Sequence, residues 1–260
     1  MASIPWTRQP EYAANFSWSP GDVRLLIDMR SGLSNRTKGI SGGTYAGSAV
    51  PLPSAGGHSA YLGWNGSASS YILLGTDSSI LLSTSSGVYV GMSPALGSAY
   101  LFTTSWNAAS GANGFGLTLI GGYFSIAKSN VAHILQSTSA TLASAGVPFA
   151  FAWSYNSSTG RARIAINGVL YSGTSTQTLT HTSAALGTLR NDSANSARHF
   201  MNMFLLSGAE CFSDEYLRQV SINPWQIFDP EDVSYVGSAT ATVPYWAFAR
   251  NNHVIGVGVN

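Results

Sequence analysis

The clearest alternation of hydrophobic and polar positions lies in the segment PFAFAWSYNSSTGRARIAINGVLYS, residues 148–172. Aromatic and small residues alternate in its first part, and successive side chains of a strand point to opposite faces of a sheet. The aromatic positions are Phe149, Phe151, Trp153 and Tyr155. NSSTG at 156–160 and the Asn167-Gly168 pair are turn sequences. The pattern predicts a three-stranded antiparallel meander with Trp153 in the core, and we expect the meander at the centre of a sheet.

Short alternating runs continue along most of the chain. The run at 22–29, DVRLLIDM, predicts a half-buried strand, whereas residues 31–57 are rich in Gly, Ser and Pro, with few strand signals beyond Thr44-Tyr45. The glycines in and beside 115–126 predict bulges or close backbone approach. The remaining predicted strands are 58–64, 71–74, 80–82, 88–92, 100–104, 115–126, 178–182 and 198–206. Their spacing, without β-α-β alternation, predicts an all-β fold, a two-sheet antiparallel sandwich.

One short helix is predicted near the end of this pattern. Ser213 is a favourable N-cap, Asp214 and Glu215 complement the dipole in the first turn, and Leu217 and Val220 supply an apolar side. The helix should end at Asn223-Pro224, because the residue before a proline disfavours the α conformation.

The order of short strands, then SDEYLRQVS, then INPWQIF, resembles the C-terminal end of laminin-G-like (concanavalin A-like) jelly-roll domains of bacteriophage virion proteins. The resemblance covers residues 20–228, and its ending is more specific than the strand pattern. It implies a jelly-roll domain at 21–228 and a structural role in the virion. Such domains occur on tails, fibres and capsid exteriors, so the position on the virion stays open.

Two segments flank this domain. Residues 1–20 carry three prolines with aromatic residues between them, which predicts an extended arm. Residues 229–260 include two apolar runs around Arg250-Asn251-Asn252, which predicts a terminal β-hairpin. Both segments carry large aromatic rings that need burial, and a two-stranded hairpin cannot bury its own. We therefore expect both segments to contact another subunit or a virion neighbour; the alternative is that they pack on their own domain. The proposed contact residues are Trp6, Trp18, Tyr245, Trp246 and Phe248.

The amino-acid composition limits the classes of binding partner that the chain can have. Charged residues make up 9% of the chain and the net charge is +1, against a usual charged share of about 25%. Nucleic-acid binding is disfavoured because it needs clustered basic residues, and Arg161 with Arg163 is the one close pair inside a strand. No apolar run reaches the roughly 20 residues of a membrane span. The neutral, hydroxyl-rich surface favours an assembly component, a homo-oligomer included, or a glycan binder.

Motifs for catalysis and for cofactors are missing from the sequence. Glycosidases need two carboxylates flanking the scissile bond, and the four glutamates lie outside the central strands. Nucleophile-elbow, zinc-helix and phosphate-loop motifs are absent, and the five histidines show no paired spacing. We therefore expect no enzyme activity, no cofactor and no metal. Three loop residues could serve as calcium ligands but are interpreted as turn formers: Asp77, Asn191 and Asp192. Cys211, the sole cysteine, is interpreted as a buried apolar residue.

Carbohydrate binding is the positive hypothesis, because sugars stack their apolar faces on exposed aromatic rings. Trp64 and Trp106 border loops, each beside an asparagine that can donate a hydrogen bond. The candidate binding residues are Tyr61, Trp64, Trp106 and Asn107. We expect a non-enzymatic tail, baseplate or fibre protein, assembled in the host bacterial cytoplasm, that contributes to attachment to host-surface glycans. The alternatives are a purely structural capsid-exterior protein and, less favoured, a polysaccharide-cleaving enzyme.

Overall fold

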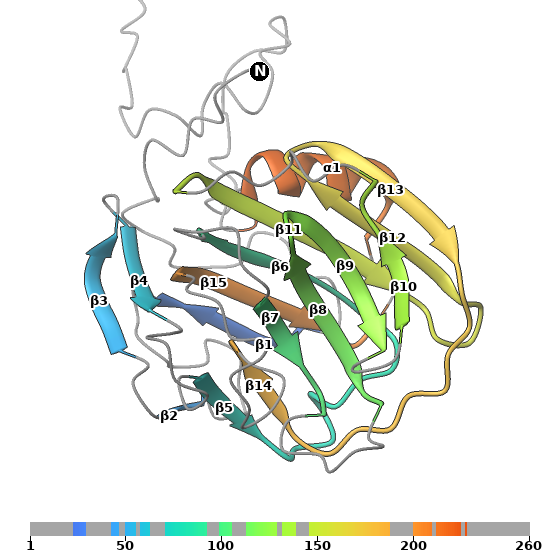
Figure 1. Cartoon of the computed structure of the whole chain (residues 1–260), viewed down its shortest axis with the longest axis horizontal. Coiled ribbons are helices and arrows are strands. Elements are labelled where there is room, and N and C mark those ends of the chain that lie inside the picture. The colour runs from blue at the N-terminus through green and yellow to red at the C-terminus, as the bar shows by residue number, and fades with distance from the viewer. Residues whose placement is uncertain are drawn as a thin grey trace, which may run out of the picture.

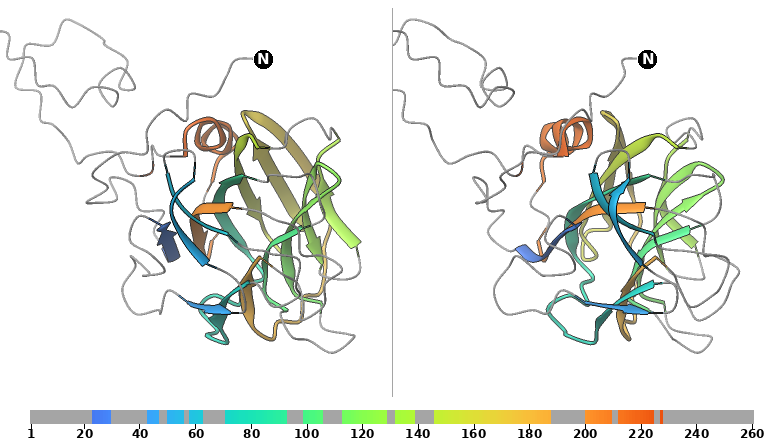
Figure 2. Two further views of the ribbon diagram at one scale, coloured as in Figure 1. Left: turned by 60° about the vertical axis from the view of Figure 1, so that its left-hand side comes forward. Right: turned by 90° about the vertical axis from the view of Figure 1, so that its left-hand side faces the viewer.

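The computed structural model of the chain describes residues 23–29, 43–46, 50–55, 58–62, 71–92, 99–105, 113–128, 132–138, 146–187, 200–209, 212–224 and 227. These residues form two antiparallel sheets that face each other, with one helix outside the first sheet (Figures 1 and 2). The predicted all-β jelly-roll sandwich is therefore confirmed. The predicted arm at 1–20 and extension at 229–260 lie outside the described residues.

Sheet A has eight strands in the order β13-β12-β11-β6-β15-β4-β3, with β1 paired to β15 beside this path. Its strands are β1 (Val23–Asp28), β3 (Val50–Ala55), β4 (His58–Leu62), β6 (Ser85–Met92), β11 (Pro148–Tyr155), β12 (Arg161–Ile166), β13 (Val169–Thr174) and β15 (Phe200–Ser207).

Sheet B has seven strands in the order β10-β9-β8-β7-β14-β5-β2. Its strands are β2 (Thr44–Ala46), β5 (Tyr71–Gly75), β7 (Ala99–Thr103), β8 (Phe115–Ile120), β9 (Tyr123–Lys128), β10 (Ala132–Gln136) and β14 (Ala184–Leu186). The segment between β13 and β14 crosses from sheet A to sheet B (Figure 1).

The main core lies between the sheets and is rich in aromatic rings. Phe124 contacts Phe149 and Phe151 across the sandwich, at ring-centroid distances of 4.9 and 5.1 Å. Trp153 is fully buried, and its indole N–H donates to Ser85 Oγ at 3.3 Å. A Cβ at Gly87, the residue opposite Trp153 on β6, would collide with the indole. Glycine at that position therefore makes room for the ring, and the prediction that Trp153 is a core residue is confirmed.

A second apolar layer lies between the outer face of sheet A and helix α1 (Asp214–Ile222). Leu217 and Val220 of the helix are fully buried in the same cluster as Ala152 and Ala165. Ile227, just beyond the helix, is buried in it too. Leu217, Val220 and Ile227 thus hold the helix against the outer face of sheet A. No helix within the described residues is long and apolar enough to cross a membrane.

The meander and the helix form as predicted, but the meander's place in the sheet differs. Strands β11, β12 and β13 pair in sequence, with a tight turn at Asn167-Gly168, where both residues have positive φ. The expected central position is wrong, because β13 is the edge strand of sheet A and β6 and β15 hold the middle.

Other expectations are corrected by the strand boundaries. Residues 80–82 form no strand, because they belong to a turn region in which the Ile80 side chain is buried in the core. Residues 178–182 form no strand, and single hydrogen bonds such as Thr182 N–H to Thr104 O hold them. The run 115–126 divides into β8 and β9 because Gly121 and Gly122 take φ values of 58° and 86°, which suit a two-residue hairpin turn.

Two further corrections concern the N-terminal strands. β1 is buried on both faces from Leu25 to Asp28 rather than on one, because Leu26 joins the layer beneath the helix. β3 is an unpredicted strand, VPLPSA, within the Gly/Ser/Pro-rich region. Its two prolines fit its place at the edge of sheet A, where a missing N–H breaks no ladder.

Candidate functional site

The site begins with how helix α1 is held. Ser213 caps the helix, its Oγ accepting the Tyr216 N–H at 3.1 Å. Ser221 Oγ accepts the N–H of Gly168 at 2.8 Å, and Arg218 donates to the Gly168 carbonyl at 3.3 Å. These bonds attach the helix to the β12–β13 turn and place its first turn over β12.

A row of polar residues crosses the outer face of sheet A at this level. Ser86, Ser154, Arg163 and Ser172 are direct cross-strand neighbours on β6, β11, β12 and β13. Ser86 Oγ donates to Ser154 Oγ at 3.0 Å, and Arg163 Nη2 donates to the same Ser154 oxygen at 3.1 Å. The Arg163 guanidinium is therefore fixed from below by the sheet.

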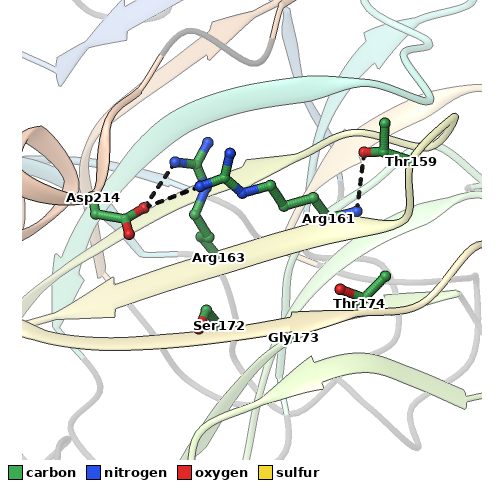
Figure 3. Close-up of a pocket in the computed structure, with 7 residues that line it drawn as sticks. All are labelled: Thr159, Arg161, Arg163, Ser172, Gly173, Thr174 and Asp214. Atoms are coloured by element: carbon green, nitrogen blue, oxygen red, sulfur yellow. Dashed lines mark hydrogen bonds and ion pairs between the residues drawn. The ribbon is translucent and has the colours of Figure 1, made fainter.

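Arg163 also binds the helix. Its Nη1 donates to Asp214 Oδ1 at 2.8 Å, and its side chain is only 5% exposed. Arg161, two residues earlier on the same face of β12, brings Nη2 to 3.8 Å from the same oxygen, and its side chain is 56% exposed. Figure 3 shows both guanidinium groups converging on Asp214. One carboxylate therefore sits between a buried arginine and an exposed one.

These side chains line an open depression of about 520 Å³ at the edge of sheet A. Its lining comes from β12, β13, the β11–β12 turn and the helix start: Thr159, Arg161, Arg163, Ser172, Gly173, Thr174 and Asp214. Thr174 is the cross-strand neighbour of Arg161, as Ser172 is of Arg163, so each arginine lies beside a hydroxyl (Figure 3). We call this the basic depression.

Asp214 is ionised at neutral pH. The hydrogen bond from Arg163 holds the pKa of its carboxyl below the usual value of 3.8, and the nearby charges of Arg163, Arg161 and Arg218 act in the same direction. Within the described residues, three of the five Lys and Arg side chains thus surround one carboxylate. Glu215 is adjacent and accepts a hydrogen bond from Gln219 at 2.8 Å.

A second polar cluster surrounds His181. Its Nε2 lies 2.8 Å from Ser83 Oγ and its Nδ1 lies 2.7 Å from Thr104 Oγ1. Burial lowers the pKa of His181 below 6.5. The third member of a hydrolytic triad would be a carboxylate that stabilises the imidazolium, and here a threonine hydroxyl takes that place. The cluster instead ties the turn after β5, the end of β7 and the segment before β14 to one another.

Most predicted site residues lie elsewhere. Tyr61 is on β4, opposite Met201. Asp77 caps a turn, its Oδ1 accepting the Ser79 N–H at 2.8 Å, and groups of three potential metal ligands are absent among the described residues. The remaining predicted binding, contact, calcium and thiol residues lie outside the described ranges: Trp64, Trp106, Asn107, Trp6, Trp18, Tyr245, Trp246, Phe248, Asn191, Asp192 and Cys211.

The basic depression was not predicted. The sequence contained its signal, because Arg161 and Arg163 are a close basic pair on one strand face of a chain with few charges. What it did not indicate is that Asp214, distant in sequence, completes the group.

Comparisons with known proteins find similar folds. No protein-family model matches the sequence, and no curated protein matches it. Domain 4 of AbnA, an extracellular arabinanase from Geobacillus stearothermophilus, in complex with arabinotriose, superimposes with a TM-score of 0.56 at 16% identity, over 77% of this chain and 98% of that domain. These likenesses establish the fold alone.

Two further matches are to larger chains. The binding domain of botulinum neurotoxin DC in complex with SialylT gives a TM-score of 0.56 at 13% identity, over 79% of this chain and 52% of the other. The Trypanosoma rangeli sialidase in complex with sialic acid gives 0.58 at 11% identity, over 80% of this chain and 34% of the enzyme. These matches support the jelly-roll fold that the resemblance implies. They give no support to a bacteriophage virion origin.

Proposed function

We propose that this chain is a non-catalytic glycan-binding protein built on a concanavalin A-like sandwich. The observation that carries the proposal is the match to nearly the whole length of an arabinanase domain solved with arabinotriose. Structures of this fold solved with sialic acid and with SialylT add to its support. The hydroxyl-rich, weakly charged composition suits sugar recognition, which relies on hydrogen bonds and aromatic stacking.

The distribution of acidic residues supports binding without cleavage. Of the Asp and Glu residues in the described ranges, only Asp28 lies on a strand, and its side chain is fully buried. Asp77 caps a turn and Asp214 is bound to Arg163. Glycoside hydrolysis usually requires two carboxylates that flank the scissile bond. The adjacent pair Asp214 and Glu215 at the start of α1 is engaged by Arg163 and Gln219. A polysaccharide-cleaving enzyme remains the competing function, since the similar folds include an arabinanase domain and a sialidase.

A role in the virion is the more specific part of the proposal. It rests on the sequence at 213–228, which resembles the C-terminal end of jelly-roll domains in bacteriophage virion proteins. In a tail, baseplate or fibre position, glycan binding by the sandwich would contribute to host attachment, and the segments 1–20 and 229–260 would supply contacts to a homo-oligomer or a virion neighbour. Immunogold labelling of particles with an antibody against this chain distinguishes that position from a capsid exterior.

A glycan array with bacterial surface polysaccharides tests the binding function. We expect saturable binding to at least one glycan, with no release of reducing ends on long incubation. W64A and W106A should weaken binding while the melting temperature stays near that of the wild type. Cleavage that is abolished by replacing a single Asp or Glu would establish the enzyme instead, and an array without any bound glycan would refute the glycan-binding function.

A further inference from the structure

We propose that the edge strand β13 pairs with residues 253–259 of the same chain, which add a further strand to sheet A at its open edge. This pairing is an interaction surface of the sandwich and is separate from glycan binding. Three features point to it: the unprotected edge of β13, the partly covered apolar residues on both of its faces, and the course of the chain after helix α1.

β13 ends sheet A, and its outer edge has no strand partner among the described residues. The two-residue turn before β13 makes Val169 a hydrogen-bonded partner of β12, so every second residue of β13 bonds to that strand. Ser175, which continues this series, donates its N–H to the Gly160 carbonyl at 2.7 Å. The intervening residues therefore direct their backbone N–H and C=O groups toward the open edge: Leu170, Ser172 and Thr174.

The other strands that end the two sheets carry features that discourage further pairing. β3 contains two prolines, β10 has an irregularity in its pairing with β9, and β2 has only three residues. β13, VLYSGT, keeps a regular register with β12 over six residues and contains no charged residue and no proline. Proteins usually block a long edge with charges, prolines or bulges, or cover it with another segment. Because β13 has none of these blocking features, its edge should be covered.

The residues of β13 leave both apolar layers partly uncovered. Tyr171 packs against the main core and Leu170 against the layer under helix α1, and each is only partly buried. A strand that covers both layers must be apolar on both faces, and such strands have a nearly continuous apolar sequence. Residues 253–259, HVIGVGV, have this character, since β-branched residues occur at both odd and even positions.

The chain leaves the described structure close to this edge. Ile222, the last residue of α1, lies beside the turn before β13, where a Cβ on Gly168 would come within 2.9 Å of its side chain. Ile227 is buried in the layer between the helix and sheet A. Residues 228–238 can span up to about 35 Å, whereas the strands from β15 to β13 cover about 20 Å at their usual spacing. The segment that follows can therefore reach β13 of the same molecule.

The predicted hairpin explains why residues 253–259, rather than 239–249, would pair with β13. The run at 239–249 contains Pro244, which has no N–H for a ladder between two strands. With 253–259 against β13, the run at 239–249 becomes the new edge, where a proline breaks no ladder, as in β3. Its aromatic residues then lie at the outer edge of the sheet, where they can still contact a neighbouring subunit.

Amide hydrogen exchange of the full chain, followed residue by residue by NMR, tests the pairing. We expect the outward amides of Leu170 and Ser172 to exchange at least about a hundredfold more slowly in the wild type than in Ile255→Pro, because the proline removes a donor and blocks the added strand. The amide of Tyr171, which bonds to β12, should be protected in both proteins. Val233→Pro, in the connection before the hairpin, is the matched control and should behave as the wild type does.

Several results would overturn the pairing. Outward amides that exchange in the wild type as fast as those of an unfolded peptide would show that the edge is uncovered. Protection that persists in Ile255→Pro would mean that another segment pairs with β13, and protection that falls on dilution would assign the strand to a second copy of the chain.

A second measurement needs no variant and so does not depend on the folding of Ile255→Pro. Nuclear Overhauser contacts between the backbones of β13 and residues 253–259 should appear in the wild type, and their absence would also refute the pairing. None of these results changes the glycan-binding function, which the glycan array tests separately.

Discussion

The inner face of sheet A carries large aromatic rings, whereas on β11 and β12, against which helix α1 packs, the outer apolar positions are alanines. Phe151 and Trp153 point inward from β11, and Ala150 and Ala152 point outward from the same strand. The inner layer buries most of the large side chains, and because stability grows with the apolar area buried, we expect it to contribute most of the stability. The outer layer lets the helix approach closely enough for Asp214 to reach Arg163. Stability and the placement of the candidate site are thus assigned to opposite faces of one sheet.

The largest effect should come from emptying the inner layer. Trp153→Ala removes a fully buried ring that stacks on Phe204 at 5.9 Å between centroids. We expect a loss of about 3–5 kcal/mol in the free energy of unfolding, measured by urea titration. Tyr123→Ala is the control, because Tyr123 is 37% exposed and its replacement should cost about 0.5 kcal/mol. A loss in Trp153→Ala no larger than the control's would contradict this account of the core.

An intermediate effect should follow from crowding the outer layer. Ala165 is fully buried between β12 and the helix, and a leucine there must push α1 outward. We expect Ala165→Leu to cost about 1–3 kcal/mol in the free energy of unfolding and to weaken any ligand that the basic depression binds. Val169→Leu, at a position that is 42% exposed, should leave both quantities unchanged. Unchanged stability in Ala165→Leu would mean that the helix does not need its close approach.

A smaller effect should follow from removing the helix cap. Ser213→Ala leaves the Tyr216 N–H without its side-chain acceptor, which typically costs about 1 kcal/mol. The loss should appear in the urea midpoint, while the near-ultraviolet signal of the buried aromatic rings stays the same at low urea. Ser78→Ala, at an exposed position, serves as the control. A changed aromatic signal would show that the two layers are not independent.

The smallest effects should be two separate pH ranges in which the folding stability falls. The pKa of His181 is lowered by burial, so its contribution to stability is present above pH 6.5 and falls as the pH drops below that value, where the unfolded chain binds the proton first. The pKa of Asp214 is lowered by Arg163, so its contribution is present above pH 3.8 and is lost as the pH falls through the folded value.

Variants should remove these windows one at a time. Melting temperatures of His181→Gln should lose the upper pH dependence and keep the lower one, and Asp214→Asn should do the reverse. If His181→Gln keeps a fall in melting temperature just below pH 6.5, that window belongs to another group.

The sequence allowed the meander and the helix to be predicted because their signals are local. Asn167-Gly168 is a turn pair, and Ser213 with Asn223-Pro224 bounds the helix. The errors arose where local pattern and long-range pairing diverge. The β3 segment was missed because its prolines disfavour a strand everywhere except at an edge, and sequence does not reveal which strand will be an edge. Residues 178–182 alternate like a strand, yet no neighbouring strand is aligned to receive them.

The candidate site was predictable only in part for the same reason. The Arg161 and Arg163 pair is visible on one strand, and Asp214 is visible at a helix start. Their meeting depends on the outer layer of small residues, which brings a helix from the end of the domain onto a strand in its middle. Local periodicity contains no information on that docking.

The pairing of β1 with β15 has a consequence for how the chain reaches its native state. β1 is the first described strand and β15 the last, and β15 is also the strand that pairs with one side of β6 in the middle of sheet A. Among the described strands β1 pairs with β15 alone, so during synthesis this pairing must wait until the ribosome has passed residue 207. Strands that wait for distant partners fold slowly and leave unpaired edges exposed. We therefore expect the nascent chain to depend on chaperones until β15 emerges and closes the sheet.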